Sequence, residues 1–242
     1  MRYSHSLRKY HSQPHNYLSA IILIASILAI GALVAISHSN TLNLARDLAL
    51  STVRVFLAYF ITLPLALIVV ILITRKTKVE DFFVPVLDVA QSLPAFAFLP
   101  VMIAALGRGT LTIALFLTVE MIWPIIFTTL SALKTTRQDL SEAATVFQST
   151  GIKRLWHFIL PSIFPSIVTG SIIGWGEAWE TIVGAELIAG KNGIGAFIGK
   201  LNDSGSTFLF GVAVIILMLF IFILNRLIWL PLLKRSTKYQ TE

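Results

Sequence analysis

Five ionisable side chains interrupt otherwise apolar stretches of this sequence, and they are the first candidates for chemistry. They are Arg54, Glu120, Glu177, Glu180 and Glu186. A charge near the centre of a bilayer costs about 2.5–3.5 kcal/mol on insertion scales, so such a group faces protein or water. Two explanations stay open. The groups line the path of a polar solute, or Arg54 pairs with one acid and the pair only fixes how two helices align.

Two tryptophans interleave with the acids of one apolar stretch. Glu177 and Glu180 are three residues apart and therefore lie near one face of a helix. Trp175 and Trp179 are either anchors at the membrane interface or a gate, and we include Trp179 among the candidate path residues. Several acids in one stretch suit an anionic solute only if they are protonated, paired or away from its path.

The composition predicts the element type that must position these groups. Of 242 residues, 56% are hydrophobic and 13% are charged, and the mean hydropathy is +0.82, far from the values of a soluble domain. Since a span needs about 20 apolar residues, we expect an all-α polytopic membrane helix bundle with about six transmembrane helices. The predicted spans are 18–37, 48–74, 84–106, 110–132, 163–189 and 208–232.

The basic residues predict an orientation. Of the 19 Lys and Arg residues, 13 fall in the N-terminal segment 1–17, the connection at 75–78, the loop 133–162 and the tail 233–242. Cytoplasmic loops are enriched in such residues, so both termini and the 133–162 loop are predicted to be cytoplasmic. Four basic residues then lie on the opposite side: Arg46, Arg108, Lys191 and Lys200. The net charge of +7 is thereby attributed to orientation, and no nucleic-acid partner is expected.

Several kinds of chemistry are not expected in this chain. It has no Cys, and its five His residues show no ligand spacing, so we predict no metal site. We find no phosphate-binding P-loop, so any ATP hydrolysis would need a separate subunit. The short connections leave no room for a catalytic domain, and we expect no catalytic residue.

The loop after the fourth predicted span has a helix signature. Asp139 or Ser141 can cap a helix start, and Glu142 favours the positive end of its dipole. Gly151 is a plausible turn before a second short helix, and Pro161 opens the next span. This pattern is typical of a helix on the membrane surface or of one that docks in a partner's groove. The apolar stripe of the first helix is Leu140, Ala143, Ala144 and Phe147.

This loop resembles the EAA loop of ABC-importer permeases. Glu142, Ala143 and Ala144 match the Glu-Ala-Ala of that motif, and the Leu-Pro pair at 160–161 has the family spacing. Gln148 stands where the family has Gly, and Phe158 where it has an aliphatic residue. Because Gly permits a left-handed turn, the turn would move to Gly151.

The resemblance implies a fold and a set of partners. The fold would be that of a type I ABC-importer permease, similar to methionine importers, with its domain at 48–232 in a bacterial-type plasma membrane. The partners would be a second, identical or related permease, two cytoplasmic ATPases that hold ATP and Mg, and an external substrate-binding protein. The loop would couple the chain to the ATPases through Leu140, Glu142, Ala143, Ala144, Phe147, Gln148 and Gly151.

Two further stretches are similar to the nitrate, sulfonate and taurine branch of these permeases. They run from Pro85 to Gly107 and from Ala178 to Gly195, and they imply a small anion of that kind as substrate. In the first stretch, Pro94 and Pro100 also predict a helix kink.

Two other functions remain open beside the permease of an ABC importer. A secondary transporter or channel with a carboxylate relay is the alternative function, and a non-transporting assembly subunit is the third.

Small residues recur along the fifth predicted span. Such a stripe lets membrane helices approach closely. We expect it to serve packing, either within one permease or between two. Its members are Ser162, Ser166, Gly170, Gly174 and Ala178.

Overall fold

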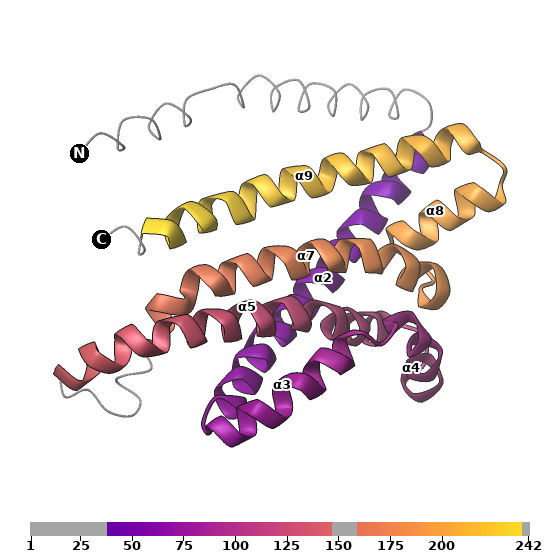
Figure 1. Ribbon diagram of the computed structural model, residues 1–242. Coiled ribbons are helices and arrows are strands. Elements are labelled where there is room, and N and C mark those ends of the chain that lie inside the picture. The colour runs from indigo at the N-terminus through magenta and orange to yellow at the C-terminus, as the bar shows by residue number, and fades with distance from the viewer. Residues whose placement is uncertain (1–37, 147–158, 239–242) are drawn as a thin grey trace.

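The computed structural model describes residues 38–146 and 159–238, with side chains described for 43–135 and 159–236. In these ranges every regular element is a helix, which confirms the predicted all-α membrane bundle (Figure 1). The first predicted span, 18–37, lies outside the described residues. The helices are α2 (His38–Ile73), α3 (Thr77–Gln91), η2 (Ala95–Ala97), α4 (Leu99–Leu106), α5 (Thr110–Val146), α7 (Leu160–Ala189), α8 (Ile194–Asp203) and α9 (Thr207–Lys238).

Three of the helices are long and apolar enough to cross a membrane. These are α2, α5 and α9, and the bent pair of α3 and α4 has the composition of a fourth span. The 30-residue α7 is not among them, and it packs against α2, α5, α8 and α9. A helix covered by protein on several sides needs little lipid-compatible surface.

The predicted span 84–106 is two helices rather than one. α3 and α4 meet at an angle of 74°, with the short helix η2 between them. Pro94 lacks a backbone N–H and disfavours helical backbone in the residue before it, so α3 ends at Gln91. Pro100 lies in the first turn of α4, where no hydrogen bond is lost. The expected kink is confirmed, but it is a break in the helix.

A helix that we did not predict lies in the connection before α9. The structure forms α8 there, ten residues long, and α8 contacts α2, α7 and α9. Its apolar residues Ile194 and Ile198 are buried in the core, while Lys200 is exposed. The segment is too short to register as a span, which is why hydropathy missed it.

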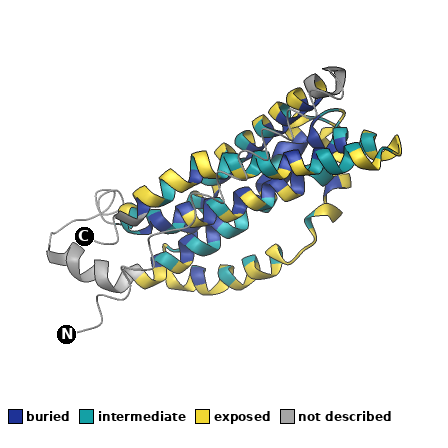
Figure 2. Cartoon of the chain, turned by 90° about the horizontal axis from the view of Figure 1, so that it is seen from above, coloured by how far each residue is buried: buried dark blue, intermediate teal, exposed yellow. Residues whose placement is uncertain are grey.

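The most extensive helix contact is between α5 and α7. In Figure 1, α5, α7 and α9 run side by side, and α2 crosses them. Buried residues gather along these contacts, and exposed residues face outwards (Figure 2). A Cβ at Gly174 would lie 2.8 Å from the Met121 carbonyl oxygen, and one at Gly170 would lie 2.8 Å from the Pro124 carbonyl oxygen. These two glycines therefore let the backbones of α5 and α7 touch within one chain.

The rest of the small-residue stripe extends this contact. Ala178 is fully buried, and Ser166 is half-buried beside a cavity that Thr128 of α5 also lines. Ser162 lines the same cavity.

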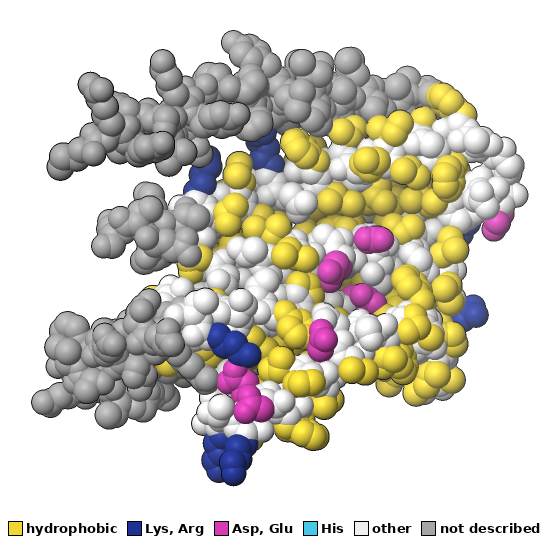
Figure 3. Space-filling view, in the orientation of Figure 1, with side chains coloured by type: hydrophobic (Ala, Val, Ile, Leu, Met, Phe, Trp, Pro, Cys, Tyr) yellow, Lys and Arg dark blue, Asp and Glu magenta, His cyan; other side chains and the backbone are white. Residues whose placement is uncertain are grey.

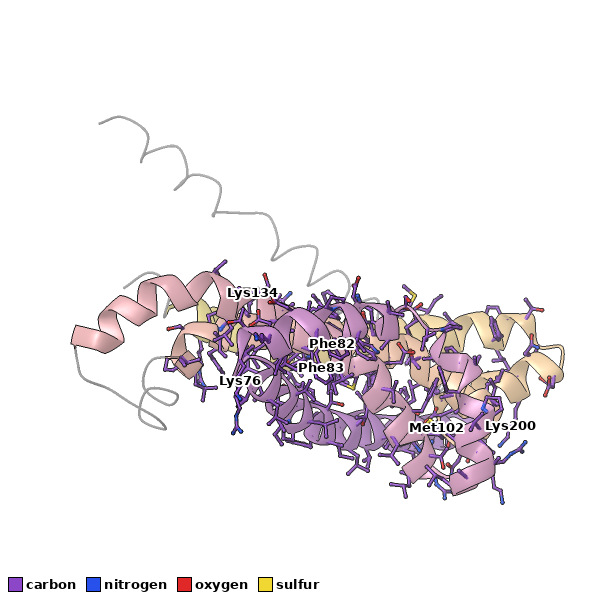
Figure 4. The ribbon with its side chains drawn as sticks, turned by 60° about the horizontal axis from the view of Figure 1, so that its bottom comes forward. Lys76, Phe82, Phe83, Met102, Lys134 and Lys200 are labelled. Carbon is purple, nitrogen blue, oxygen red and sulfur yellow. The ribbon has the colours of Figure 1, made fainter. Side chains whose placement is uncertain are left out.

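An ion pair joins α3 to α5 near one end of the bundle. Lys134 Nζ lies 3.2 Å from Glu80 Oε1. Glu80 is in the first turn of α3 and is buried, whereas Lys134 is half-exposed. Figure 4 places Lys76 and Lys134 towards this end and Lys200 towards the other. The pair ties the start of the broken span to the helix that continues into the 133–162 loop.

A substitution tests the contact between α5 and α7. Gly174→Val should lower the free energy of unfolding by about 2 kcal/mol or more, because the new side chain collides with the backbone at Met121. Thermal unfolding in detergent, followed by size-exclusion chromatography, would measure the loss. The matched control is Gly176→Val, in the same helix with nothing within 4 Å of its Cβ position. Equal stability of the two variants would contradict this account of the packing.

Candidate functional site

Arg54 of α2 and Glu186 of α7 form a buried ion pair. Arg54 Nη1 lies 2.6 Å from Glu186 Oε1, and the two side chains are only 4% and 0% exposed. Ser51 Oγ lies 2.8 Å from each Glu186 oxygen and can donate to one of them, and the Gly195 N–H donates at 3.0 Å. The carboxylate is thus surrounded by donors, which offsets the cost of removing it from water.

All five N–H groups of the Arg54 guanidinium have acceptors. Besides Glu186, they donate to the Asn192 carbonyl oxygen at 2.8 Å, to Asn192 Oδ1 at 2.6 Å and twice to Thr110 Oγ1 at 3.3 Å. One side chain therefore joins α2 to the start of α5, the end of α7 and the turn before α8.

The same cluster fixes the start of α8. Asp47 Oδ1 accepts from the Gly193 N–H at 3.0 Å, and Ser51 Oγ accepts from the Ile194 N–H at 2.9 Å. Gly193 has φ +110°, and a Cβ there would collide with the Glu186 carboxylate. Only glycine fits this position without strain, since the backbone conformation and the space both exclude a side chain.

The structure answers which acid Arg54 meets. It brings Arg54 together with Glu186 and with none of the other three glutamates of the predicted set. Sequence reasoning missed Asp47, Ser51 and Asn192. Ser51 could have been found, because it lies one turn before Arg54 on the same helix face.

The other three acids lie on an outward face of α5 and α7. Glu120 and Glu177 are half-buried, Glu180 is exposed, and the three carboxylates are close enough to repel one another. Figure 3 shows Asp and Glu side chains in the middle of a hydrophobic face. We call Glu120, Glu177 and Glu180 the acidic face. An acidic face amid apolar surface must meet protein or water when the chain is in a membrane.

Trp179 does not belong to this face. It is 2% exposed, and its ring lies 5.8 Å from that of Phe220 on α9. Trp175 is 1% exposed and contacts Phe56 and Trp229 edge to face, with ring centroids 4.9 and 5.7 Å away. Both tryptophans are thus core residues between α2, α7 and α9. Of the two alternatives given for them, a gate or anchors at the membrane interface, their burial contradicts the anchors.

The predicted coupling residues divide between described and undescribed parts of the chain. α5 continues without a break to Val146, so Leu140, Glu142, Ala143 and Ala144 lie in its last turns. The expected helix start at Asp139 or Ser141 is wrong, because the chain is already helical there. Phe147, Gln148 and Gly151 lie outside the described residues.

Comparisons with known proteins agree with these observations. A family model described as "Binding-protein-dependent transport system inner membrane component" matches residues 63–238. The taurine transport system permease protein of Escherichia coli is 31% identical over 181 residues, which cover 74% of this chain and 66% of the relative. A nitrate import permease protein of Leptolyngbya laminosa is 31% identical over 182 residues, covering 75% and 65%.

A third relative carries a different substrate in its name. The glycine betaine/carnitine transport permease protein of Listeria monocytogenes is 29% identical over 189 residues, covering 77% of this chain and 66% of the relative. The chain thus spans slightly less than two thirds of the length of each of these relatives.

Removing the buried cation tests the cluster around Arg54. Arg54→Met should cost about 3–5 kcal/mol of stability, because it leaves the Glu186 carboxylate buried without its partner. The double variant with Glu186→Leu should recover part of that loss, since the orphaned charge is then gone. Thermal unfolding in detergent measures both. Arg108→Met, at an exposed arginine, is the control. An Arg54 variant as stable as this control would contradict the assigned role.

Proposed function

We propose the function of this chain from its family, since it belongs to the inner membrane components of binding-protein-dependent transport systems. We infer that it is the permease subunit of an ABC importer. It pairs with a second permease, identical or related, and two such subunits enclose the path of the substrate. Two cytoplasmic ATPases bind ATP and Mg, and an external substrate-binding protein delivers the substrate. The chain itself carries no ATPase site.

The continuity of α5 carries this proposal. The helix has 37 residues and is about 55 Å long at about 1.5 Å per residue. The hydrocarbon core of a bilayer is only about 30 Å thick, so a rigid end that includes Leu140, Glu142 and Ala144 can extend beyond it. Because α5 packs backbone to backbone on α7 at Gly170 and Gly174, a push at that end moves both helices. A lever of this kind is what coupling to an ATPase requires.

The acidic face supports a position for the substrate path. In one chain, Glu120, Glu177 and Glu180 face outwards from α5 and α7. We propose that this face meets the second permease and lines the path. Inside the bundle, away from this face, the buried pair of Arg54 and Glu186 holds the helices in place, and Trp179 packs in the core.

The acidic face also narrows the class of substrate. A simple anion would be repelled by several carboxylates, whereas a zwitterion presents a cationic group to them. Relatives are named for taurine and for glycine betaine, which are zwitterions, and for nitrate, which is an anion. We propose a small zwitterion of the taurine type as substrate.

A charge reversal tests the coupling role. Glu142→Lys should leave the protein inserted and folded but abolish ATPase association and uptake, because it places a positive charge on the docking segment. Pull-down of the ATPase and ATP-driven uptake in proteoliposomes are the measurements. Thr136→Lys also introduces a lysine, earlier in α5, and should retain activity. Wild-type uptake by the Glu142 variant, or uptake by the chain alone on a proton gradient, would overturn the proposal.

Neutralising the acidic face tests the path. The triple variant Glu120→Gln, Glu177→Gln, Glu180→Gln should unfold no earlier than wild type, because it removes three like charges that repel one another in the wild type. Its rate of taurine uptake should fall by about tenfold. This corresponds to the loss of about 1.4 kcal/mol of attraction between the ammonium group of taurine and the carboxylates. Nitrate uptake should not fall. Unchanged taurine uptake would place the path elsewhere.

A further inference from the structure

A basic hollow lies at the end of the bundle opposite Lys134. Its volume is about 560 Å³, and it opens between the start of α2, the turn before α8 and α8 itself. Figure 4 shows Lys200 at this end and Lys76 and Lys134 towards the other. The charged and amide side chains that line the hollow include Arg46, Asp47, Lys191, Asn192 and Lys200.

The charges of the hollow are unbalanced. Arg46, Lys191 and Lys200 are exposed, and among the described residues none of them forms an ion pair with a carboxylate. Asp47 is the one acid among the lining residues, and it is buried with Oδ1 bound to the Gly193 N–H. The hollow therefore presents an excess of positive charge to anything that approaches from this end.

These cations lie where a membrane protein has few basic residues. Lys and Arg are depleted on the external side of membrane proteins, and this end is the external one in the orientation predicted from charge. Of the four basic residues assigned there, three line this one hollow, and the fourth, Arg108, does not. Cations that gather against the topological preference indicate an anionic partner.

The buried cluster holds the hollow in shape. Both oxygens of Asn192 accept from Arg54, and the backbone of Gly193 is fixed by Asp47. The backbone that carries Lys191 is therefore a rigid turn. Lys200 is on α8, whose first turn is hydrogen-bonded to α2. A surface that is already ordered loses little entropy when a partner binds.

We propose that Arg46, Lys191 and Lys200 form a docking surface for an acidic patch on the external substrate-binding protein. A single small ion suits the hollow less well, because exposed cations hold an isolated charge weakly. Several exposed pairs across a protein interface instead accelerate and orient the encounter. This inference rests on the proposed function, since it requires a binding-protein partner.

Association kinetics test the docking surface. The permease with its ATPases is placed in phosphatidylcholine nanodiscs and exposed to the purified substrate-binding protein of the same operon. The triple variant Arg46→Glu, Lys191→Glu, Lys200→Glu should reduce the association rate constant by about tenfold or more at low salt. It should also remove the decrease that added NaCl causes in wild type. Among single reversals, Lys200→Glu should slow association, and the matched control Arg108→Glu should not.

The outcomes separate this inference from the proposed function. If wild type does not bind the substrate-binding protein at all, the proposed function fails. If wild type binds and the triple variant, with unchanged thermal stability, associates equally fast, only the docking surface is wrong. An effect of the reversals that appears only in phosphatidylglycerol nanodiscs would assign the hollow to a lipid headgroup. Unchanged docking with lower uptake would assign it to the substrate. Both of these results overturn the proposal.

Discussion

The ion pair between Arg54 and Glu186 is the constraint on which the rest of the described structure depends. A guanidinium and a carboxylate can be buried together only if their remaining hydrogen-bonding groups also find partners. Here all five guanidinium donors are used, and their acceptors come from α5, from α7 and from Asn192 in the turn before α8. Moving any of these segments would leave a buried charge unsatisfied, so their mutual positions are fixed.

α7 shows how one helix can serve several surfaces at once. Gly170 and Gly174 let it touch α5, and Trp175 packs into the aromatic core with α2 and α9. Glu177 and Glu180 emerge between these two contacts on the outward face. The two turns from Gly174 to Thr181 thus each contribute a small residue, an aromatic residue and an acid in different directions.

The two ends of the bundle differ in how they are held. At one end, hydrogen bonds from α2 fix the start of α8 and hold the basic hollow in shape. At the other, α5 extends past its contact with α7, and the pair between Glu80 and Lys134 links it to the broken span of α3 and α4. A rigid end that carries the basic hollow and a protruding helix at the opposite end suit the proposed function, in which the substrate arrives on one side and the ATPases act on the other.

The sequence by itself determined the helical membrane class, the approximate positions of the long helices after residue 48, a kink near Pro94 and the family. Hydropathy, proline and short motifs are local properties, so they can be read without the fold. Only the tertiary structure decided that Arg54 meets Glu186, that Trp179 is buried and that α8 forms. Glu186 lies far from Arg54 in the chain, and the four glutamates look alike in sequence. Which of them is buried depends on how the helices are rotated and packed, and that is a property of the whole bundle.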